Sequence, residues 1–245
     1  MEFRVDLHSH TVASDHAFST LAEYASQAAA RGLCMFATTD HGPALEDSPH
    51  PWHFANLRIV PRVMEGVAIL RGAEANINDD GSIDLEPWAL SALDIVLAGF
   101  HHIEPRDAAA NTWKVKQAMS SGRVDIITHP GNLRYPIDHE EFLLSARDNG
   151  VAVEINGSSS VYSRLNSHDN CVALMRLARK IGNVIALGSD AHIATYLGNF
   201  DECKRVMREA GIGADQILNE SPIKVLDFLS GRGHTGLDDL YRHVS

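Results

Sequence analysis

Histidine is the residue type in this chain whose number and spacing most suggest chemistry: it occurs 14 times in 245 residues. His8, His10 and His16 lie close together near the N-terminus, directly after a short apolar segment. Because alternate residues of a strand point to the same side, His8 and His10 could face a common metal ion. The pair is a weak signal by itself, since a chain with this histidine content would contain about one His-x-His by chance.

Short apolar segments bounded by turn residues predict seven strands, and the segments between them predict helices that end at glycine. The strands are expected at residues 3–7, 35–39, 67–71, 94–99, 124–128, 151–155 and 184–188. The helices are expected at 19–31, 111–121, 138–149 and 168–181, with two more at about 200–210 and 222–230. Strands that alternate with helices and are apolar throughout are typical of a buried parallel sheet. We therefore expect an α/β fold, a distorted TIM-like barrel of seven parallel strands, (β/α)7, in a single domain over residues 1–245. A doubly wound open sheet is the alternative.

Polar side chains follow every predicted strand at its C-terminal end. In chain order they are His8, His10 and His16; Asp40 and His41; Glu74; His101 and His102; His129; Asn156; and Asp190 and His192. The C-terminal ends of parallel barrel strands form one face, and barrel active sites are built on that face. The nine candidate metal ligands are His8, His10, His16, His41, Glu74, His101, His129, Asp190 and His192.

Seven imidazoles and two carboxylates exceed the needs of one ion, because zinc usually takes four ligands. The set suits two or three ions, and Glu74 could bridge a pair of them. Nitrogen-rich ligands favour zinc, manganese or iron over calcium and magnesium. A histidine that binds metal also needs a partner for its other ring nitrogen, which Asp6 or Asp40 could supply. His102 and Asp40 are therefore alternatives for such supporting roles.

Composition restricts the possible partners. The net charge is −11 without any basic run, which argues against nucleic acid and favours a small ligand. No long apolar segment is present for secretion or for a membrane span, so a cytoplasmic protein is expected. The three cysteines show no Cys-x-x-Cys spacing, which argues against a disulfide framework or a thiolate zinc site.

Taken together, the motifs resemble those of the PHP (polymerase and histidinol phosphatase) superfamily, and within it the small stand-alone bacterial phosphatases. They include "DLHSHTVAS" at 6–14, "TTDHG" at 38–42, "RGAEANI" at 71–77, "GFHH" at 99–102, "THPGN" at 128–132, "EING" at 154–157 and "GSDAH" at 188–192. The resemblance implies a seven-stranded barrel with three metal ions, usually zinc. It assigns His8, His10, Glu74 and Asp190 to one ion, Glu74, His101 and His129 to a second, and His16, His41 and His192 to a third. It also makes a homo-oligomer, such as a trimer, an expectation to test.

The leading functional hypothesis is a phosphatase that hydrolyses a small phosphate monoester through metal-bound hydroxide. The alternatives are a phosphodiesterase or 3'-5' exonuclease of the PHP type, an amidohydrolase-like hydrolase, and a non-catalytic, metal-stabilised binding module. The common two-metal amidohydrolase site uses a carbamylated lysine at a strand end, whereas all five lysines here fall in predicted helices. All nine ligand positions are intact, which argues against a module without catalytic activity.

Four further residues could contact substrate, namely Arg134, Asn156, Arg164 and His53. Each arginine is equally well explained as an exposed surface charge, which we take as the simpler interpretation. The remaining histidines outside the motifs, His139, His168, His234 and His243, are expected at the surface.

Overall fold

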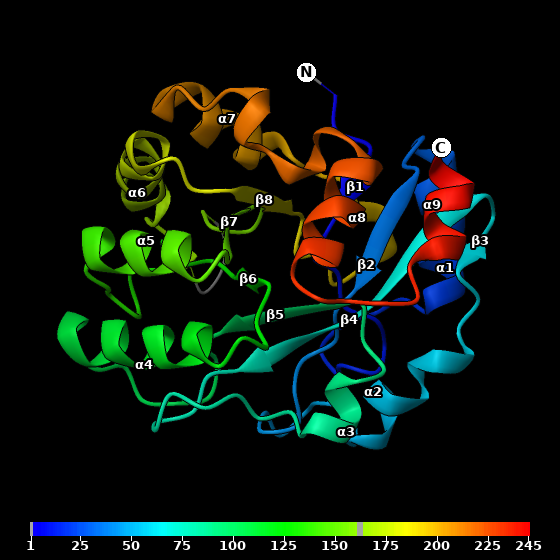
Figure 1. Ribbon diagram of the computed structural model, residues 1–245, viewed down its shortest axis with the longest axis horizontal. Coiled ribbons are helices and arrows are strands. Elements are labelled where there is room, and N and C mark those ends of the chain that lie inside the picture. The colour runs from blue at the N-terminus through cyan, green and yellow to red at the C-terminus, as the bar shows by residue number, and fades with distance from the viewer. Residues whose placement is uncertain (1, 161–163) are drawn as a thin grey trace.

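The computed structural model describes residues 2–160 and 164–245 (Figure 1). Within these ranges, seven parallel strands are hydrogen-bonded in the order β1-β2-β4-β5-β6-β7-β8. They are β1 (Val5–Asp6), β2 (Met35–Thr38), β4 (Val67–Asn76), β5 (Ile95–Gly99), β6 (Ile126–Ile127), β7 (Ala152–Asn156) and β8 (Ile185–Gly188). A short strand, β3 (Val63–Met64), pairs antiparallel with β4.

The sheet closes on itself beyond the ends of β1 and β8. The His10 N–H donates to the Ala191 carbonyl (2.8 Å), and the Asp190 N–H donates to the His8 carbonyl (3.0 Å). These bonds join the first and last strands, so the sheet is a nearly closed barrel. The predicted TIM-like barrel is confirmed and the open doubly wound sheet is wrong.

The six predicted helices are present, with bounds that differ by a few residues. The long helices are α1 (Leu21–Ala30), α4 (Ala108–Ser120), α5 (His139–Asp148), α6 (His168–Ile181), α7 (Asp201–Ala210) and α8 (Pro222–Gly231). The sequence reading missed the short helices α2 (Trp52–Asn56) and α3 (Pro87–Leu90) and the C-terminal α9 (Asp238–Val244). Helix α4 begins three residues earlier than predicted because the Asp107 carboxylate caps it, accepting the Ala110 N–H at 2.8 Å.

Strand β4 is longer than the sequence indicated, since it continues from the predicted end at Arg71 to Asn76. The predicted strand stops before Gly72, but the structure shows that a glycine is needed here for close packing. A Cβ atom at Gly72 would lie 2.7 Å from the side chain of Ile95 on the neighbouring strand β5. Glu74 and Asn76 therefore belong to the strand itself, and Glu74 is in register with Leu97 of β5.

The barrel interior is apolar at the N-terminal ends of the strands and polar at the other end. Met35 and Leu97 pack there with Leu226 and Leu229 of α8, so this helix covers the N-terminal opening (Figure 1). Helices α4, α5 and α6 pack along one flank, where α4 contacts α5 and α5 contacts α6. Among the described helices, none has both the length and the apolar content that crossing a bilayer requires.

Candidate metal centre

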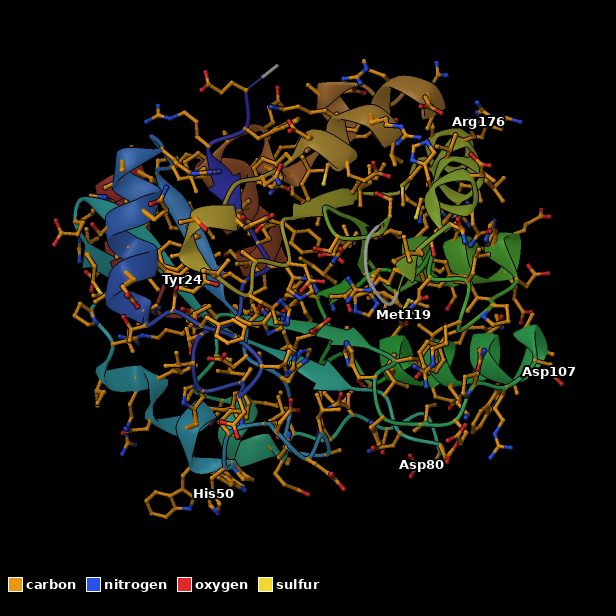
Figure 2. The ribbon with its side chains drawn as sticks, turned by 180° about the vertical axis from the view of Figure 1, so that it is seen from behind. Tyr24, His50, Asp80, Asp107, Met119 and Arg176 are labelled. Atoms are coloured by element: carbon orange, nitrogen blue, oxygen red, sulfur yellow. The ribbon has the colours of Figure 1, made fainter. Side chains whose placement is uncertain are left out.

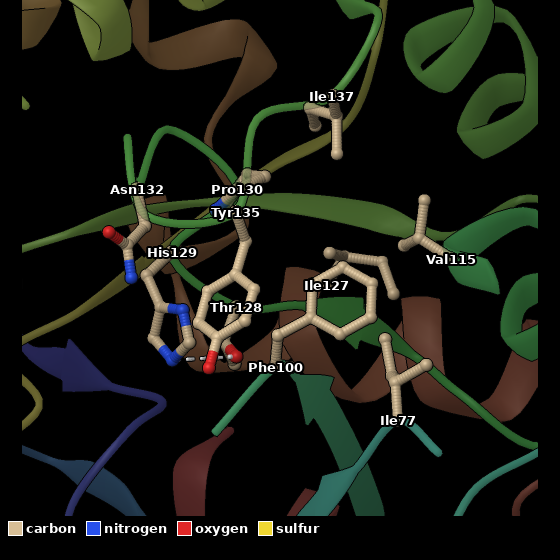
Figure 3. Close-up of a pocket in the computed structure, with 11 residues that line it drawn as sticks. Ile77, Phe100, Val115, Ile127, Thr128, His129, Pro130, Asn132, Tyr135 and Ile137 are labelled. Atoms are coloured by element: carbon tan, nitrogen blue, oxygen red, sulfur yellow. Dashed lines mark hydrogen bonds between the residues drawn. The ribbon is translucent and has the colours of Figure 1, made fainter. Parts of the chain in front are cut away.

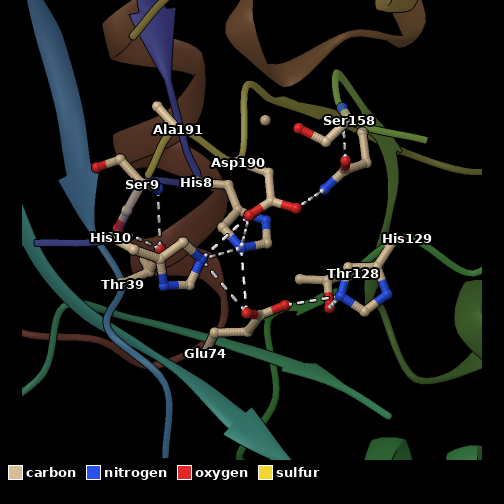
Figure 4. A network of polar contacts seen from close by, with 12 residues as sticks. His8, Ser9, His10, Thr39, Glu74, Thr128, His129, Ser158, Asp190 and Ala191 are labelled. Atoms are coloured by element: carbon tan, nitrogen blue, oxygen red, sulfur yellow. Dashed lines mark hydrogen bonds and ion pairs between the residues drawn. The ribbon is translucent and has the colours of Figure 1, made fainter. Parts of the chain in front are cut away.

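His8, His10, Glu74 and Asp190 converge at the C-terminal end of the barrel (Figure 4). The Nε2 atoms of His8 and His10 are 3.0 Å apart. Glu74 Oε2 lies 3.3 and 3.5 Å from these two nitrogens, and Asp190 Oδ1 lies 3.6 and 3.2 Å from them. Tetrahedral zinc with bonds of about 2.0–2.1 Å separates its ligand atoms by about 3.3 Å. The four side chains therefore have the spacing of one tetrahedral ligand set.

The other oxygen of Glu74 belongs to a second set of ligand atoms. Glu74 Oε1 lies 3.2 Å from His101 Nε2 and 3.0 Å from His129 Nε2. These two nitrogens are 3.1 Å apart. The two oxygens of Glu74 thus face two separate groups of imidazoles, which is the arrangement that a bridging carboxylate requires.

A third group of imidazoles lies beside the first. Ligand atoms of His10, His41 and His192 all lie within 4.8 Å of one another. The ring of His16 stacks on those of His41 and His192, at centroid distances of 5.1 and 4.8 Å. His16 is held there by Asp47, whose Oδ2 is 2.5 Å from His16 Nδ1. All nine predicted ligands are therefore gathered at this end of the barrel.

The polar atoms at the centre of this cluster fit a metal site better than a set of protein hydrogen bonds. Among the described residues, Glu74 Oε2 and Asp190 Oδ1 are buried and accept no hydrogen bond, and His10 Nδ1 is likewise without a partner. Buried carboxylate oxygens are costly unless a donor or a cation compensates them. A divalent ion coordinated by the two carboxylate oxygens would provide that compensation.

Burial and neighbouring charges shift the pKa values of several side chains in the cluster. Burial alone would raise the pKa of Glu74, but His101 and His8 hold it well below its ordinary value. Burial opposes ionisation of Asp190 too, yet Arg164 and His8 keep its pKa low. Burial lowers the pKa of His101 and of His129. Glu74 and Asp190 therefore stay ionised and His101 and His129 neutral, as metal ligation requires. His8 differs, since burial would lower its pKa but Glu74, Glu154 and Asp190 raise it well above its ordinary value.

Two of the strand ends carry unusual backbone conformations. His129 follows β6 with φ of 35°, and Asp190 follows β8 with φ of 56°. Residues with side chains rarely adopt this left-handed region, and such strain often accompanies functional sites. The His129 N–H donates to Glu154 Oε2 at 2.7 Å, which helps to hold that conformation.

Glu154 also orients His8 and was missed by the sequence analysis. Its Oε1 lies 2.6 Å from His8 Nδ1, so His8 turns its Nε2 toward the other ligands. Asn76 does the same for His101, because its Oδ1 lies 2.8 Å from His101 Nδ1. Such partners fix which ring nitrogen can bind a metal. The signal was a Glu-x-Asn pattern within each of two apolar strands, β4 and β7.

The predicted partners of the histidine rings, Asp6 and Asp40, have other roles. Asp6 accepts backbone N–H groups of His8, Ser189 and Gly198 at 2.7–3.3 Å and so joins β1 to the segment after β8. Asp40 accepts the N–H and hydroxyl of Thr11 and the hydroxyl of Ser14. Both carboxylates therefore shape the loops that carry the ligands. His102, the other candidate for a supporting role, is exposed.

A pocket of about 640 Å³ opens next to the imidazoles, and His16, His41, His101, His129 and His192 line it. Arg134 and Arg164 line it as well. The interpretation of Arg164 as an exposed surface charge is wrong, because only 13% of its side chain is exposed and its Nη1 lies 2.5 Å from Asp190 Oδ2. Arg134 is exposed at the pocket wall, with its guanidinium 5.6 Å from the centre of the Tyr135 ring.

The other two predicted substrate contacts occupy positions outside the lining of this pocket. Asn156 is buried, and its Nδ2 donates to Glu154 Oε2 at 3.0 Å and to Asp190 Oδ2 at 3.2 Å. His53 lies beside Asp40, with 3.3 Å between Nε2 and Oδ2. Asn156 therefore holds the Asp190 carboxylate, a candidate ligand, through a direct hydrogen bond.

A smaller cavity of about 20 Å³ lies behind His129, and Figure 3 shows that its lining is largely apolar. Ile77, Phe100 and Tyr135 are among the side chains that surround it. A space of this size holds a water molecule at most. Tyr135 donates its hydroxyl to the carbonyls of His101 (3.2 Å) and Ile103 (3.0 Å), which fixes the loop after β5.

One of the histidines that we expected at the surface is buried. His168 lies at the start of α6, with its Nδ1 2.6 Å from Glu202 Oε1 and its Nε2 3.2 Å from Glu209 Oε2, both on α7. The prediction was wrong because the two carboxylates that pair with His168 lie more than 30 residues away in the chain, so the pairing could not be read from the local sequence. His234 is also half-buried, near Asp125 at the opposite end of the barrel.

Comparisons with known proteins agree with the motifs. A probable phosphatase of Shewanella sp. (strain MR-4) is 50% identical over 243 residues, covering 98% of this chain and 96% of the relative. The probable phosphatase YcdX of Escherichia coli O81 (strain ED1a) is 50% identical over 234 residues, covering 94% of this chain and 96% of the relative.

The fold is similar to that of histidinol phosphate phosphatase from Lactococcus lactis subsp. lactis Il1403, whose crystal structure contains zinc, L-histidinol and phosphate. The TM-score is 0.59, with 87% of this chain and 95% of that chain covered, and the sequences are 16% identical. A family model described as the PHP domain matches residues 6–220. Because that match spans most of the chain, the protein belongs to the PHP domain family, as the motifs predicted.

Proposed function

We propose that this protein hydrolyses a small phosphate monoester at a centre of three divalent metal ions. It shares its family and about half of its residues with relatives named probable phosphatases, over nearly its whole length, and is accordingly a hydrolase of phosphoric esters. The observation that most supports a multinuclear centre is Glu74, whose two oxygens face separate sets of imidazoles. A carboxylate so placed suits two neighbouring cations.

The three sets of candidate ligands support a separate position for each ion. His8, His10, Glu74 and Asp190 would hold one, Glu74, His101 and His129 a second, and His16, His41 and His192 a third. Zinc suits this nitrogen-rich set best, with manganese or iron as alternatives. Ions bound there would lower the pKa of a water molecule and neutralise phosphate oxygens.

The side chains around the candidate ligands could bind the phosphate and orient a metal-binding histidine. Arg164 reaches the pocket with its guanidinium beside Asp190, where it can donate hydrogen bonds to a phosphate oxygen. Nearby carboxylates, Asp190 first, outweigh burial and raise the pKa of Arg164, so it remains charged. Glu154 holds His8 in the ring orientation that directs Nε2 to the ligand cluster.

The amidohydrolase-like alternative finds less support. Its common two-metal form needs a lysine at a strand end, and among the described residues that line the pocket there is no lysine. The phosphodiesterase and exonuclease alternatives require room for a second esterified group or a polymer. An assay that compares monoester and diester substrates is therefore needed to distinguish these activities from that of a monoesterase.

The test compares hydrolysis of p-nitrophenyl phosphate with that of bis(p-nitrophenyl) phosphate by one metal-analysed sample. We expect faster turnover of the monoester and close to three transition-metal ions per chain by elemental analysis. Faster turnover of the diester would overturn the monoesterase proposal. A metal content of one ion or none after metal-replete expression would overturn the trinuclear centre.

A further inference from the structure

A second pocket, separate from the metal centre, is lined mainly by cations. It has a volume of about 670 Å³ and lies where the C-terminal parts of α6 and α7 pack together. Four of the residues that line it are positively charged, namely Arg176, Arg179, Lys180 and Arg208. Figure 2 shows Arg176 on the outer side of α6, at the edge of the molecule. We call this cavity the α6–α7 pocket.

The α6–α7 pocket lies away from the metal ligands. Helix α6 leads directly into β8, which begins at Ile185, so the end of α6 lies toward the N-terminal end of that strand. The metal ligands lie at the other ends of the strands, as His129 after β6 and Asp190 after β8 show. Among the described residues, the two pockets share no lining residue. A ligand in the α6–α7 pocket would therefore not touch the metal centre.

Helix dipoles explain only part of the positive charge in this pocket. Cations are favoured near the C-terminal end of a helix, which carries about half a negative charge. Arg179 and Lys180 lie in the last turn of α6, and Arg208 lies in the last turn of α7. The two helix ends thus offset about one of the four positive charges. About three charges remain to be compensated by another group.

The carboxylate beside these cations is engaged by other side chains. Among the described residues that line the pocket, Glu209 alone is acidic. Its Oε2 lies 3.2 Å from His168 Nε2, and its Oε1 lies 3.4 Å from Arg205 Nε. Like charges that lie close together repel one another and destabilise the fold. The excess positive charge therefore favours an anion in the α6–α7 pocket.

Two of the guanidinium groups are held in place by the end of α7. Arg176 donates from Nε (3.3 Å) and Nη2 (3.1 Å) to the Glu209 carbonyl. Arginine has five N–H donors, so this contact leaves others for a ligand. Gly211 ends α7 with φ of 73°, and a Cβ atom there would lie 2.8 Å from Arg179 Nη1. Because Gly211 has no side chain, Arg179 can lie against the end of α7.

The lining residues indicate a compact ligand with phosphate groups. Guanidinium groups bind phosphate oxygens through paired hydrogen bonds. Sites for single-stranded nucleic acid combine cations with aromatic side chains on which the bases stack. Among the described residues, no aromatic side chain lines the α6–α7 pocket. A long polyanion, whether nucleic acid or acidic peptide, would also have to cross the surface of a protein with a net charge of −11.

We propose that the α6–α7 pocket binds a compact anion with two or three linked phosphate groups. A single phosphate ester carries at most about two negative charges, fewer than the three or so that remain uncompensated. Arg176 and Arg179 of α6 and Arg208 of α7 would bind the phosphate oxygens from both helices. This inference goes beyond the proposed phosphatase function, because the ligand is bound here and is not hydrolysed.

The experiment titrates the metal-loaded protein with methylenediphosphonate and measures binding by calorimetry. This diphosphate analogue resists phosphatases because a carbon atom joins its two phosphorus atoms. Excess magnesium prevents the analogue from removing the bound metal ions, and elemental analysis after the titration checks that they remain. The metal centre can bind the analogue too, so the decisive quantity is the binding that depends on Arg179 and Arg208.

Arg179→Gln and Arg208→Gln should each weaken that binding by about three- to tenfold, and the double variant by about 10–100-fold. The affinity of the wild type should fall as the salt concentration rises. The matched control is the double variant Arg58→Gln/Arg123→Gln, which removes two positive charges at exposed positions of η1 (Leu57–Ile59) and of the loop before β6. It should bind the analogue as the wild type does. Thermal unfolding confirms that each variant is folded.

Equal affinity of the wild type and the folded Arg179→Gln/Arg208→Gln protein would overturn the proposal. Equal affinity for methylphosphonate and methylenediphosphonate would overturn the requirement for two phosphate groups. Tighter binding of a short polyglutamate peptide or of oligouridylate, dependent on the same two arginines, would overturn the compact ligand in favour of an acidic protein or RNA. Because the readout is binding, each result stands whether or not the protein hydrolyses phosphate monoesters.

Discussion

Replacing Glu154 with glutamine should weaken metal binding although Glu154 itself is not a ligand. The carboxylate is buried, with one oxygen 2.6 Å from His8 Nδ1 and the other accepting the His129 N–H at 2.7 Å and the Asn156 amide at 3.0 Å. It therefore supports one histidine from each of two ligand sets. Glutamine has nearly the same shape but only one oxygen.

The consequence of Glu154→Gln follows from that single oxygen. His129 and Asn156 both donate to one side of the Glu154 side chain, so the amide oxygen should face them and the NH₂ group should face His8. His8 Nδ1 must then accept, which places the ring proton on Nε2, the nitrogen that lies among the other ligands. Loss of a residue that orients a metal-binding histidine usually reduces metal affinity or activity by about 10–100-fold. Because the wrong tautomer would place a proton on the nitrogen that faces the metal, we expect the larger of these losses, about 2.7 kcal/mol.

The assay is a competition between the protein and a chelator of known affinity, followed by elemental analysis and by phosphatase activity. Glu154→Gln should lose metal at chelator concentrations that leave the wild type loaded. Glu140→Gln, the same chemical change at an exposed position of α5, is the control and should behave as the wild type. Wild-type metal affinity in a folded Glu154→Gln protein would refute the reasoning.

Three further perturbations test other parts of the structure. Glu74→Ala removes both bridging oxygens and should reduce kcat by several orders of magnitude with a lower metal content, whereas near-normal turnover would mean that the site is misplaced. Arg164→Ala should raise KM for the monoester at least tenfold if the guanidinium binds phosphate, and an unchanged KM would leave it only the role of pairing with Asp190. His234→Gln tests a pair at the other end of the barrel, where the His234 ring lies 2.9 Å from Asp125 Oδ2. Burial opposes protonation there, but the hydrogen bond to Asp125 outweighs it and raises the pKa of His234. This interaction should thus stabilise the fold by about 1.5 kcal/mol below the unfolded-state pKa of about 6.5, and that stability should fade as the pH rises through the higher folded-state pKa. Thermal unfolding at pH 5.5 and 8.5 should show a larger loss for His234→Gln at the lower pH, and equal losses would contradict the assignment.

The clustering of the nine candidate ligands could be predicted because strand ends are visible in the sequence. Each apolar segment ends at a glycine, a polar residue or a histidine. The parallel strands of a barrel place their C-terminal ends, and the residues that follow them, on one face. His8, His101 and His129 are more than 90 residues apart at the extremes, yet this rule alone brings them together. The extent of β4 was less predictable, since Gly72 looks like a strand end when its contact with Ile95 is unknown.

The residues that orient the ligands were missed because their role depends on which nitrogen of a distant ring they face. Glu74-Ala75-Asn76 and Glu154-Ile155-Asn156 repeat one pattern, a glutamate and an asparagine on the same side of a buried strand. A buried carboxylate must be compensated, so Glu154 could have been assigned to the cluster from this pattern, as Glu74 was. Their roles differ because Glu74 meets the Nε2 side of His8 whereas Glu154 meets its Nδ1 side. Glu74 is thus placed to bridge two ions and Glu154 to orient the same imidazole, because strands β4 and β7 present their glutamates to different nitrogens of the His8 ring.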